Sequence, residues 1–244
     1  REQAQKDVRV LVAGFTALEQ ITPQAVRRWA LTLKNKDGSA LSASSIGRMV
    51  SFWRSYWKFL TSRDAVPAGV DPFALVERPA VSKKAAAAAG WIPFSRDDVP
   101  RLAAAARDRE DQELVDLITL GAYTGTRIEE LCSLKVSSVG PVSFKIEDAK
   151  TTAGVREVPI HAALVPLVER LKASSRDGFL LSGLTLNKYG DRSNAIGKRF
   201  GRLKASLGFG EQHVFHSLRK TLVTLLEDAG VSENLAADIV GHEK

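Results

Sequence analysis

The sequence contains a single cysteine, Cys132, so it can form neither an internal disulfide nor a zinc site built on cysteines. It has no apolar run as long as a membrane span, and its first residues do not resemble a signal peptide. It also lacks a glycine-rich loop that could cradle a nucleotide phosphate, and no group of Asp and Glu has two-metal spacing. We therefore expect a cytoplasmic protein with no metal site, and both an NTPase and metal-assisted hydrolysis are disfavoured.

Positive charge is in excess, with 35 Lys and Arg against 28 Asp and Glu and a net charge of +7. This balance favours a polyanionic partner such as DNA. The chain has 244 residues, of which 44% are apolar, enough for one large domain or two modest ones.

Residues 1–78 predict an all-helical domain. Thr22 and Pro23 are typical of a helix start, and a longer helix follows from about Ser44. Its apolar residues keep helical spacing, which favours a buried stripe over a surface that stacks on bases. The stripe consists of Ile46, Met49, Val50, Trp53, Tyr56, Trp57 and Leu60. Residues 71–73 (Asp-Pro-Phe) are expected to start a further short helical piece.

Cations lie off these apolar stripes, where they either contact DNA phosphates or are simply solvated. The candidates in this first domain are Arg27, Arg28, Arg48, Arg54 and Lys58. Residues 79–90 are rich in alanine, have no apolar period and end in glycine, which is typical of a linker. Lys83 and Lys84 within it could touch a DNA backbone.

Residues 91–244 predict a second, mixed domain. Two capping boxes are expected, Ser95 with Asp98 and Thr126 with Glu129. Residues 136–145 and 155–160 are rich in β-branched residues and predict two strands joined as a hairpin. The Ser95 box is expected to open a helix that runs through residue 106. Further helices are expected over residues 110–123, 161–173, 191–207, 216–229 and 232–240, and the helix over 191–207 is basic, with Lys198 and Arg202 as further candidates for DNA contacts.

Four separate segments carry residues suited to a phosphodiester. Arg127 follows a Thr-Gly break, Lys150 lies in the hairpin loop, His216 and Arg219 share a helix turn, and His242 follows a helix-ending glycine. Arginines can stabilise the charge of a five-coordinate phosphorus, and a lysine with a lowered pKa can protonate the leaving oxygen. Lys145 is the alternative for the lysine, although it lies within a predicted strand.

The order of these motifs resembles the tyrosine recombinase (phage integrase) family. The resemblance rests on residues 124–131 (TGTRIEEL), residues 150–159 with Lys150 and the run VREVP, residues 216–219 (HSLR) and residues 241–242 (GH). It implies a mainly α fold with a small β-hairpin in the C-terminal domain. A helical, SAM-like core-binding domain (1–78) would be joined by the linker (79–90) to a mixed α+β catalytic domain (91–244).

The resemblance also implies residue roles. Arg127 and Arg219 would be the catalytic arginines, with Glu130 orienting Arg127 or serving as an ordinary surface Glu. Lys150 would be the general acid, while His216 and His242 would contact the phosphate. His161 and His213 match nothing in the family pattern and are expected to be structural.

The activity implied is that of a site-specific DNA recombinase or integrase. It would be prokaryotic or phage-encoded and associated with a mobile genetic element. It would cleave and rejoin strands through a 3′-phosphotyrosyl intermediate, without a cofactor. Its partner would be double-stranded DNA at a specific site, where it would assemble as a dimer or tetramer, at the nucleoid rather than a membrane.

One departure concerns the nucleophile. In the family this Tyr lies shortly beyond the last Gly-His, and none of Tyr56, Tyr123 and Tyr189 fits that place. We expect a chain truncated before this Tyr, so that residues 1–244 bind DNA without cleaving it. The native protein would then present a Tyr within about a dozen residues after Lys244, because the attacking group must reach the same phosphate. The alternative is a non-catalytic, DNA-binding relative of the family.

Overall fold

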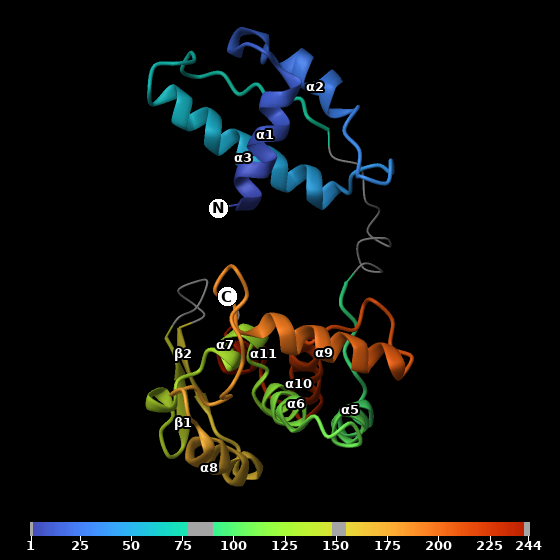
Figure 1. Cartoon of the computed structure of the whole chain (residues 1–244), viewed down its shortest axis with the longest axis vertical. Coiled ribbons are helices and arrows are strands. Elements are labelled where there is room, and N and C mark those ends of the chain that lie inside the picture. The colour runs from blue at the N-terminus through green and yellow to red at the C-terminus, as the bar shows by residue number, and fades with distance from the viewer. Residues whose placement is uncertain (1, 78–89, 148–154, 242–244) are drawn as a thin grey trace. The chain divides into compact units, whose positions relative to one another are not determined.

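The computed structural model describes residues 2–77, 90–147 and 155–241, and the chain divides into two compact units, Arg1–Ala88 and Ala89–Lys244 (Figure 1). Each unit has its own hydrophobic core. The predicted linker lies outside the described residues apart from Gly90. Within the described ranges, no helix is long and apolar enough to cross a lipid bilayer.

The first unit is helical, as predicted. Thr22 Oγ1 accepts a hydrogen bond from Ala25 N at 3.3 Å, and Ser42 Oγ accepts one from Ser45 N at 3.1 Å, so both side chains cap helices. The elements are α1 (Glu2–Gly14), the 3-10 turn η1 (Leu18–Gln20), α2 (Pro23–Ala30) and α3 (Ala43–Thr61).

The aromatic stripe of α3 forms the core of this unit. Trp53 and Trp57 are buried, and Trp53 packs against buried Phe73 with 5.8 Å between ring centroids. Trp53 Nε1 donates to Asp7 O on α1 at 2.7 Å, which satisfies its polar end. Their burial removes both tryptophans from any role in stacking on bases.

The helical piece predicted from residue 71 is wrong: residues 71–77 form turns. The Asp71 carboxylate accepts from Phe73 N at 2.9 Å and pairs with Arg54 at 2.8 Å. An Asp that bonds the backbone two residues on stabilises a local turn rather than a helix. The turn inserts Phe73 between the two tryptophans.

In its described residues, the second unit has seven α-helices and two short 3-10 turns, with a β-hairpin between α7 and α8. Its helices are α5 (Asp98–Arg107), α6 (Gln112–Thr124), α7 (Ile128–Cys132), α8 (Val165–Ser174), α9 (Ser193–Ser206), α10 (His216–Asp228) and α11 (Glu233–Val240). Two short 3-10 turns are η2 (Val136–Ser138) and η4 (Ala162–Leu164), and the strands are β1 (Ser143–Ile146) and β2 (Arg156–Pro159).

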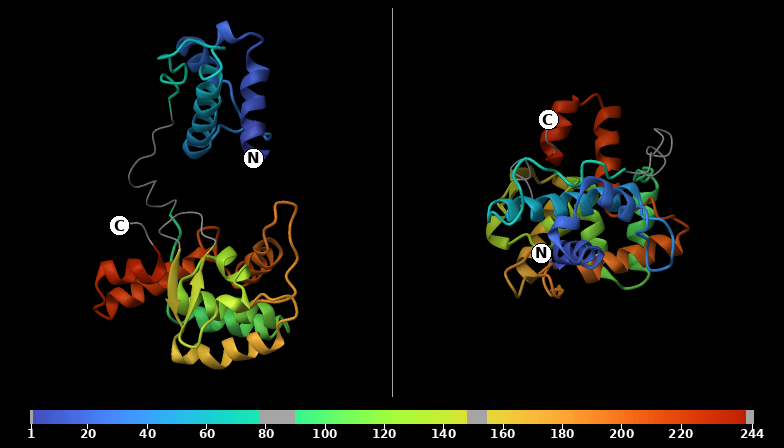
Figure 2. Two further views of the ribbon diagram at one scale, coloured as in Figure 1. Left: turned by 90° about the vertical axis from the view of Figure 1, so that its left-hand side faces the viewer. Right: turned by 90° about the horizontal axis from the view of Figure 1, so that it is seen from above.

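Helix α6 is the centre of this unit, and α5, α9 and α10 contact it. Leu114, Leu117, Ile118 and Leu120 are all at most 2% exposed, so α6 is covered on all sides. Helices α10 and α11 lie side by side (Figure 2). The Ser95–Asp98 pair is confirmed, since Ser95 N donates to Asp98 Oδ2 and Asp98 N to Ser95 Oγ at the start of α5.

The two strands pair antiparallel, with Phe144 opposite Val158 and Ile146 opposite Arg156. The predicted hairpin is therefore confirmed, although its loop, residues 148–154, lies outside the described residues. The first strand is shorter than predicted, because residues 136–138 form η2 instead. Gly140 and Pro141 lie between η2 and β1, and proline lacks the backbone N–H that pairing with a neighbouring strand needs.

Candidate functional site

Arg127 and Glu130 form the first part of the site, where α6 gives way to α7. Gly125 ends α6 in the left-handed conformation, with φ of 60°, and α7 begins three residues later. The Glu130 carboxylate accepts Arg127 N at 3.2 Å and Arg127 Nη1 at 2.7 Å. Glu130 is 9% exposed, so it is a buried partner of Arg127 and not a surface Glu.

The predicted capping box of Thr126 and Glu129 is wrong by one residue. Glu130 takes the place expected for Glu129, since it bonds the backbone of Arg127 at the start of α7. Glu129 instead accepts Arg192 N at 2.9 Å and Ser193 N at 2.8 Å, which caps α9. Neighbouring residues on a helix face different directions, so the two carboxylates serve different helices.

Arg219 and His216 come from the first turns of α10. Arg219 is only 2% exposed, and its Nη1 donates to Gly125 O at 3.1 Å. His216, three residues earlier, is half-buried. Thr221 Oγ1 donates to Phe94 O at 2.9 Å, which fixes this part of α10 against the segment before α5.

Arg156 also belongs to this site, although the sequence motifs did not identify it as a site residue. It begins β2, and its Nη2 lies 3.2 Å from Glu130 Oε2. Its side chain is 7% exposed. The sequence signals for it were its place in the run VREVP, on which the family resemblance partly rests, and its position in a short strand next to the predicted loop.

Positive charge therefore exceeds negative charge in this group, which we call the arginine cluster: Arg127, Arg156 and Arg219 around Glu130. Burial and the nearby charges of Arg127 and Arg156 together lower the pKa of Arg219 to about 10, against the opposing effect of Glu130. A buried cationic group of this kind favours an anionic ligand.

Lys150 and His242 lie outside the described residues. Segments next to both reach the arginine cluster, because Arg156 follows the hairpin loop and Gly241 precedes His242. A Cβ built on Gly241 would lie 2.7 Å from Arg156 Cδ, so these two residues are in close contact. Lys145 lies on β1, opposite Glu157, and is exposed.

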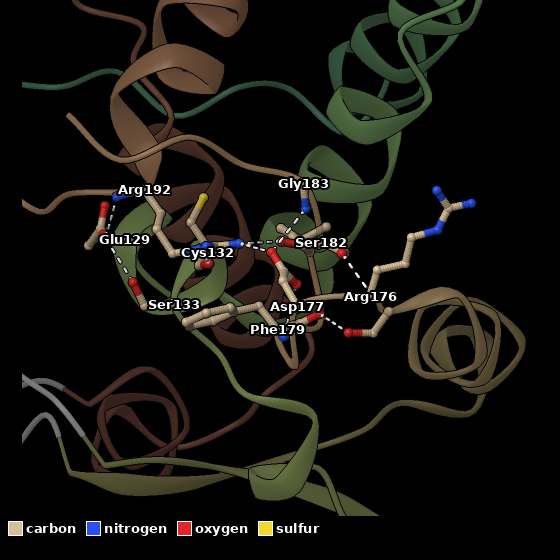
Figure 3. Close-up of polar contacts among 11 residues, drawn as sticks. Glu129, Cys132, Ser133, Arg176, Asp177, Phe179, Ser182, Gly183 and Arg192 are labelled. Carbon is tan, nitrogen blue, oxygen red and sulfur yellow. Dashed lines mark hydrogen bonds and ion pairs between the residues drawn. The ribbon is translucent and has the colours of Figure 1, made fainter.

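A buried polar network supports α7 from the other side (Figure 3). The Arg192 guanidinium donates to Cys132 O at 2.8 Å through Nε and to Leu181 O at 3.0 Å through Nη2. It also pairs with Asp177 at 3.1 Å and lies 3.7 Å from the centre of the Phe179 ring. This network and the Glu129 cap join α7 firmly to the start of α9.

Other sequence candidates for chemistry are accounted for by packing. Burial raises the pKa of Cys132 to about 12, so its thiol stays protonated and inert. His161 Nδ1 accepts from Ala163 N at 3.1 Å, and His213 packs on Phe94 and Phe209, which gives both histidines structural surroundings. In the part of the chain that the structure describes, no three His, Cys, Asp or Glu residues are grouped to hold a metal.

The tyrosines lie on separate surfaces of the two units. Tyr123 is 44% exposed and packs on His161, with 5.1 Å between ring centroids. Tyr189 is 59% exposed, and Lys188 Nζ lies 4.7 Å from its ring. Tyr56 stacks on Phe59 in the first unit.

Most candidate DNA contacts lie on exposed helical faces. Arg27, Arg48 and Arg54 pair with Glu77, Asp7 and Asp71, yet each side chain stays at least 40% exposed. Arg28 and Lys58 are exposed in the first unit, and Lys198 and Arg202 are exposed one turn apart on α9. Lys83 and Lys84 lie outside the described residues.

Comparison with known proteins gives two matches to protein families. Residues 94–244 match the phage integrase family, and residues 5–64 match the phage integrase N-terminal SAM-like domain. The chain is 27% identical over 253 residues to the tyrosine recombinase XerC of Bacillus pumilus, which covers 95% of this chain and 76% of that protein. It is 24% identical to XerC of Roseiflexus over 82% of this chain, but spans only 65% of the length of that relative.

Solved integrase structures share the fold. A lambda integrase dimer bound to a COC′ core site has a TM-score of 0.73 at 16% identity, over 99% of this chain and 68% of that chain. The Tn1549 transposon integrase in complex with a circular intermediate DNA has a TM-score of 0.68 at 20% identity, over 93% of this chain and 79% of that chain.

The arginine cluster predicts that inorganic phosphate stabilises the protein. A ligand that binds only the folded state adds about 2.7 kcal/mol at one hundred times its Kd, so phosphate should raise Tm at constant ionic strength. Arg219→Met should abolish this increase, because it removes the most buried cation of the cluster. Arg170→Met is the matched control, since Arg170 pairs with buried Asp116 elsewhere in the unit. An equal increase for the wild type and Arg219→Met would contradict an anion site here.

The polar network around Arg192 predicts that Asp177 makes a pH-dependent contribution to the stability of the fold. Burial raises its pKa, but hydrogen bonds from Gly183 N, Ser182, Phe179 N and Arg192 outweigh burial and lower it from 3.8 to about 2. The charged carboxylate therefore stabilises the fold above about pH 4, and this stability is lost as the pH falls through about 2. The Tm difference between wild type and Asp177→Asn should be largest above pH 4 and close toward pH 2. A difference that does not change with pH would show that the carboxylate charge is not what stabilises this network.

Proposed function

The chain belongs to the phage integrase family, and we propose that it is a site-specific DNA recombinase that cleaves and rejoins strands through a 3′-phosphotyrosyl intermediate. The observation that carries this proposal is the arginine cluster, in which three buried or half-buried guanidinium groups from three distant segments surround one carboxylate. The likeness of the catalytic motifs supports the same reaction.

The proposed reaction is the transfer of a DNA phosphoryl group to a tyrosine hydroxyl. A P–O bond forms to the tyrosine and the bond to the 5′ oxygen breaks, so charge builds on the non-bridging oxygens. Arg127 and Arg219 stabilise that charge, and Glu130 holds Arg127 in direction. Lys150 protonates the leaving 5′ oxygen, while His216 and His242 contact the phosphate.

The nucleophile is proposed to be a Tyr beyond the Gly241–His242 pair, as in the family that the motifs resemble. In the sequence, Tyr56, Tyr123 and Tyr189 all precede that pair, and none fits the family position of the nucleophile. Residues 1–244 by themselves should therefore bind DNA without cleaving it. Strand cleavage should be measured on the protein as its gene encodes it, with any residues that follow Lys244.

The proposed partner is double-stranded DNA carrying a specific recombination site. The exposed cations of the first unit and of α9 would contact its phosphates. Solved structures describe lambda integrase as a dimer on a core site and as a tetramer on a Holliday junction. By analogy we propose that this protein also assembles as a dimer or tetramer on DNA, at the nucleoid of a prokaryotic cell.

A non-catalytic DNA-binding relative is the second candidate function. It would keep the cationic surfaces and the integrase fold, but it would form no covalent complex with DNA. The two functions differ in one measurement, the trapping of a covalent protein–DNA adduct under denaturing conditions.

The catalytic assignment predicts large losses of rate with small losses of affinity. Arg127→Ala or Arg219→Ala should slow covalent complex formation by about a hundred- to thousandfold, because each removes a donor aimed at the developing charge. Lys150→Ala should cost roughly a hundred- to ten-thousandfold, and less on a substrate whose 5′ bridging oxygen is sulfur, since a thiolate leaves without a proton. Arg170→Met again serves as the control. If Lys150→Ala slowed covalent complex formation equally on both substrates, Lys150 would not be the general acid, and Lys145 or His216 would take its place as the candidate.

The exposed cations predict salt-dependent binding of DNA by residues 1–244. Each phosphate contact contributes about −0.9 to the slope of log K against log salt concentration, because it releases a counterion. The double variants Arg48→Ala/Arg54→Ala and Lys198→Ala/Arg202→Ala should each flatten that slope and weaken binding to all sequences alike. Affinity that is the same at low and high salt would rule out a phosphate-contacting surface, whereas an unchanged slope in one double variant would exclude only its pair.

A further inference from the structure

Arg156 shares a single carboxylate with Arg127. Glu130 Oε1 lies 2.7 Å from Arg127 Nη1, and Glu130 Oε2 lies 3.2 Å from Arg156 Nη2. Arg127 comes from the start of α7, whereas Arg156 comes from β2, 26 residues after Glu130. The Glu130 side chain is 6% exposed and that of Arg156 is 7%, so their contact is made away from bulk water, whereas the Arg127 side chain is 37% exposed.

A carboxylate held at both oxygens has little freedom to rotate. With Arg127 alone, Glu130 could follow that side chain through its rotamers, because the two residues are only three positions apart. Arg156 holds the second oxygen from a strand, which fixes the direction in which the first oxygen holds Arg127. Its charge also offsets part of the negative charge that Glu130 places beside Arg127.

Arg156 joins further segments of the site. In β2 it is registered opposite Ile146, so its backbone sets the base of the hairpin. Its Cδ and Nε lie where a side chain on Gly241 would have to go, at 2.7 and 2.9 Å from a Cβ built there. Gly241 ends α11 with φ of 72°, and only glycine adopts this conformation readily. The hairpin, α7 and the end of α11 thus meet at one guanidinium side chain.

We propose that Arg156 is a positioning residue of the recombination site, which acts through Glu130 to direct Arg127 and which sets the hairpin and the end of α11 against α7. This inference rests on the function proposed above. It assigns Arg156 no contact with the reacting phosphate. It explains why a charged side chain is buried at the start of a short strand.

The test measures covalent complex formation at saturating DNA, together with DNA affinity and Tm, on the protein as its gene encodes it. Arg156→Met keeps much of the side-chain length and removes the charge and the hydrogen bond. Misdirection of a catalytic group by about 1 Å costs roughly a hundredfold in rate, so we expect a loss of about that size with affinity changed less than about twofold. Arg156→Lys keeps the charge and should recover part of the rate.

A double-mutant cycle with Glu130→Gln separates positioning from packing. If Arg156 acts through Glu130, Arg156→Met should slow the Glu130→Gln protein by less than about threefold, because the two changes disrupt the same step. A purely structural Arg156 would lower Tm and multiply the two rate losses, which would overturn the proposal. If Arg156→Met does not fold, Arg156→Lys completes the same cycle, and independent effects on the rate would again overturn it.

Two further variants distinguish this inference from the function on which it rests. Arg170→Met, which removes an arginine from a buried carboxylate outside the cluster, should cleave at the wild-type rate. Arg127→Ala should be strongly impaired. If the wild type formed no covalent complex, or Arg127→Ala matched it, the proposed function would fail. If Arg127→Ala were impaired and Arg156→Met were not, only the role of Arg156 would fail.

Discussion

The Glu130 carboxylate is the interaction on which the site depends. It receives the guanidinium groups of Arg127 and Arg156 and the backbone N–H that starts α7. A buried carboxylate needs such partners, because desolvation of an uncompensated charge is costly. The reverse also holds: without Glu130, three arginines would repel one another in a small volume. One acid therefore makes a dense cationic group compatible with folding while leaving positive charge in excess.

The surrounding fold supplies rigidity to this group from two sides. On one side, Arg219 comes from α10, which packs on the central helix α6 and is tied by Thr221 to Phe94 O. On the other side, Arg192 and Glu129 join α7 to α9 and to the loop that carries Asp177. Helix α7 is only five residues long, so it has little stability of its own and depends on these contacts.

The sequence predicted the helices well where spacing and capping agreed, as at Thr22, Ser95 and the apolar stripe of α3. The family resemblance, and not a local pattern, implied that Glu130 orients Arg127, and the structure pairs the two side chains. The sequence could not predict Arg156, since contact between β2 and α7 depends on tertiary packing that no local pattern encodes. The errors at residues 71–77 and 136–138 have local causes, a carboxylate that bonds its own turn and a Gly-Pro break. The roles of Lys150 and His242 stay predictions.

The two adjacent acids of α7 have a consequence for how such proteins can diverge. Glu129 caps the helix that carries Lys198 and Arg202, while Glu130 serves the arginine cluster, and the two adjacent side chains point about 100° apart around the axis of α7. Insertion or loss of one residue ahead of them in α7 would rotate both carboxylates by about 100° and move each away from its present partners. This segment should therefore tolerate substitutions but not changes of length. A chimera in which α9 is exchanged to alter DNA preference would also have to keep the backbone N–H groups of residues 192 and 193 in place to donate to Glu129.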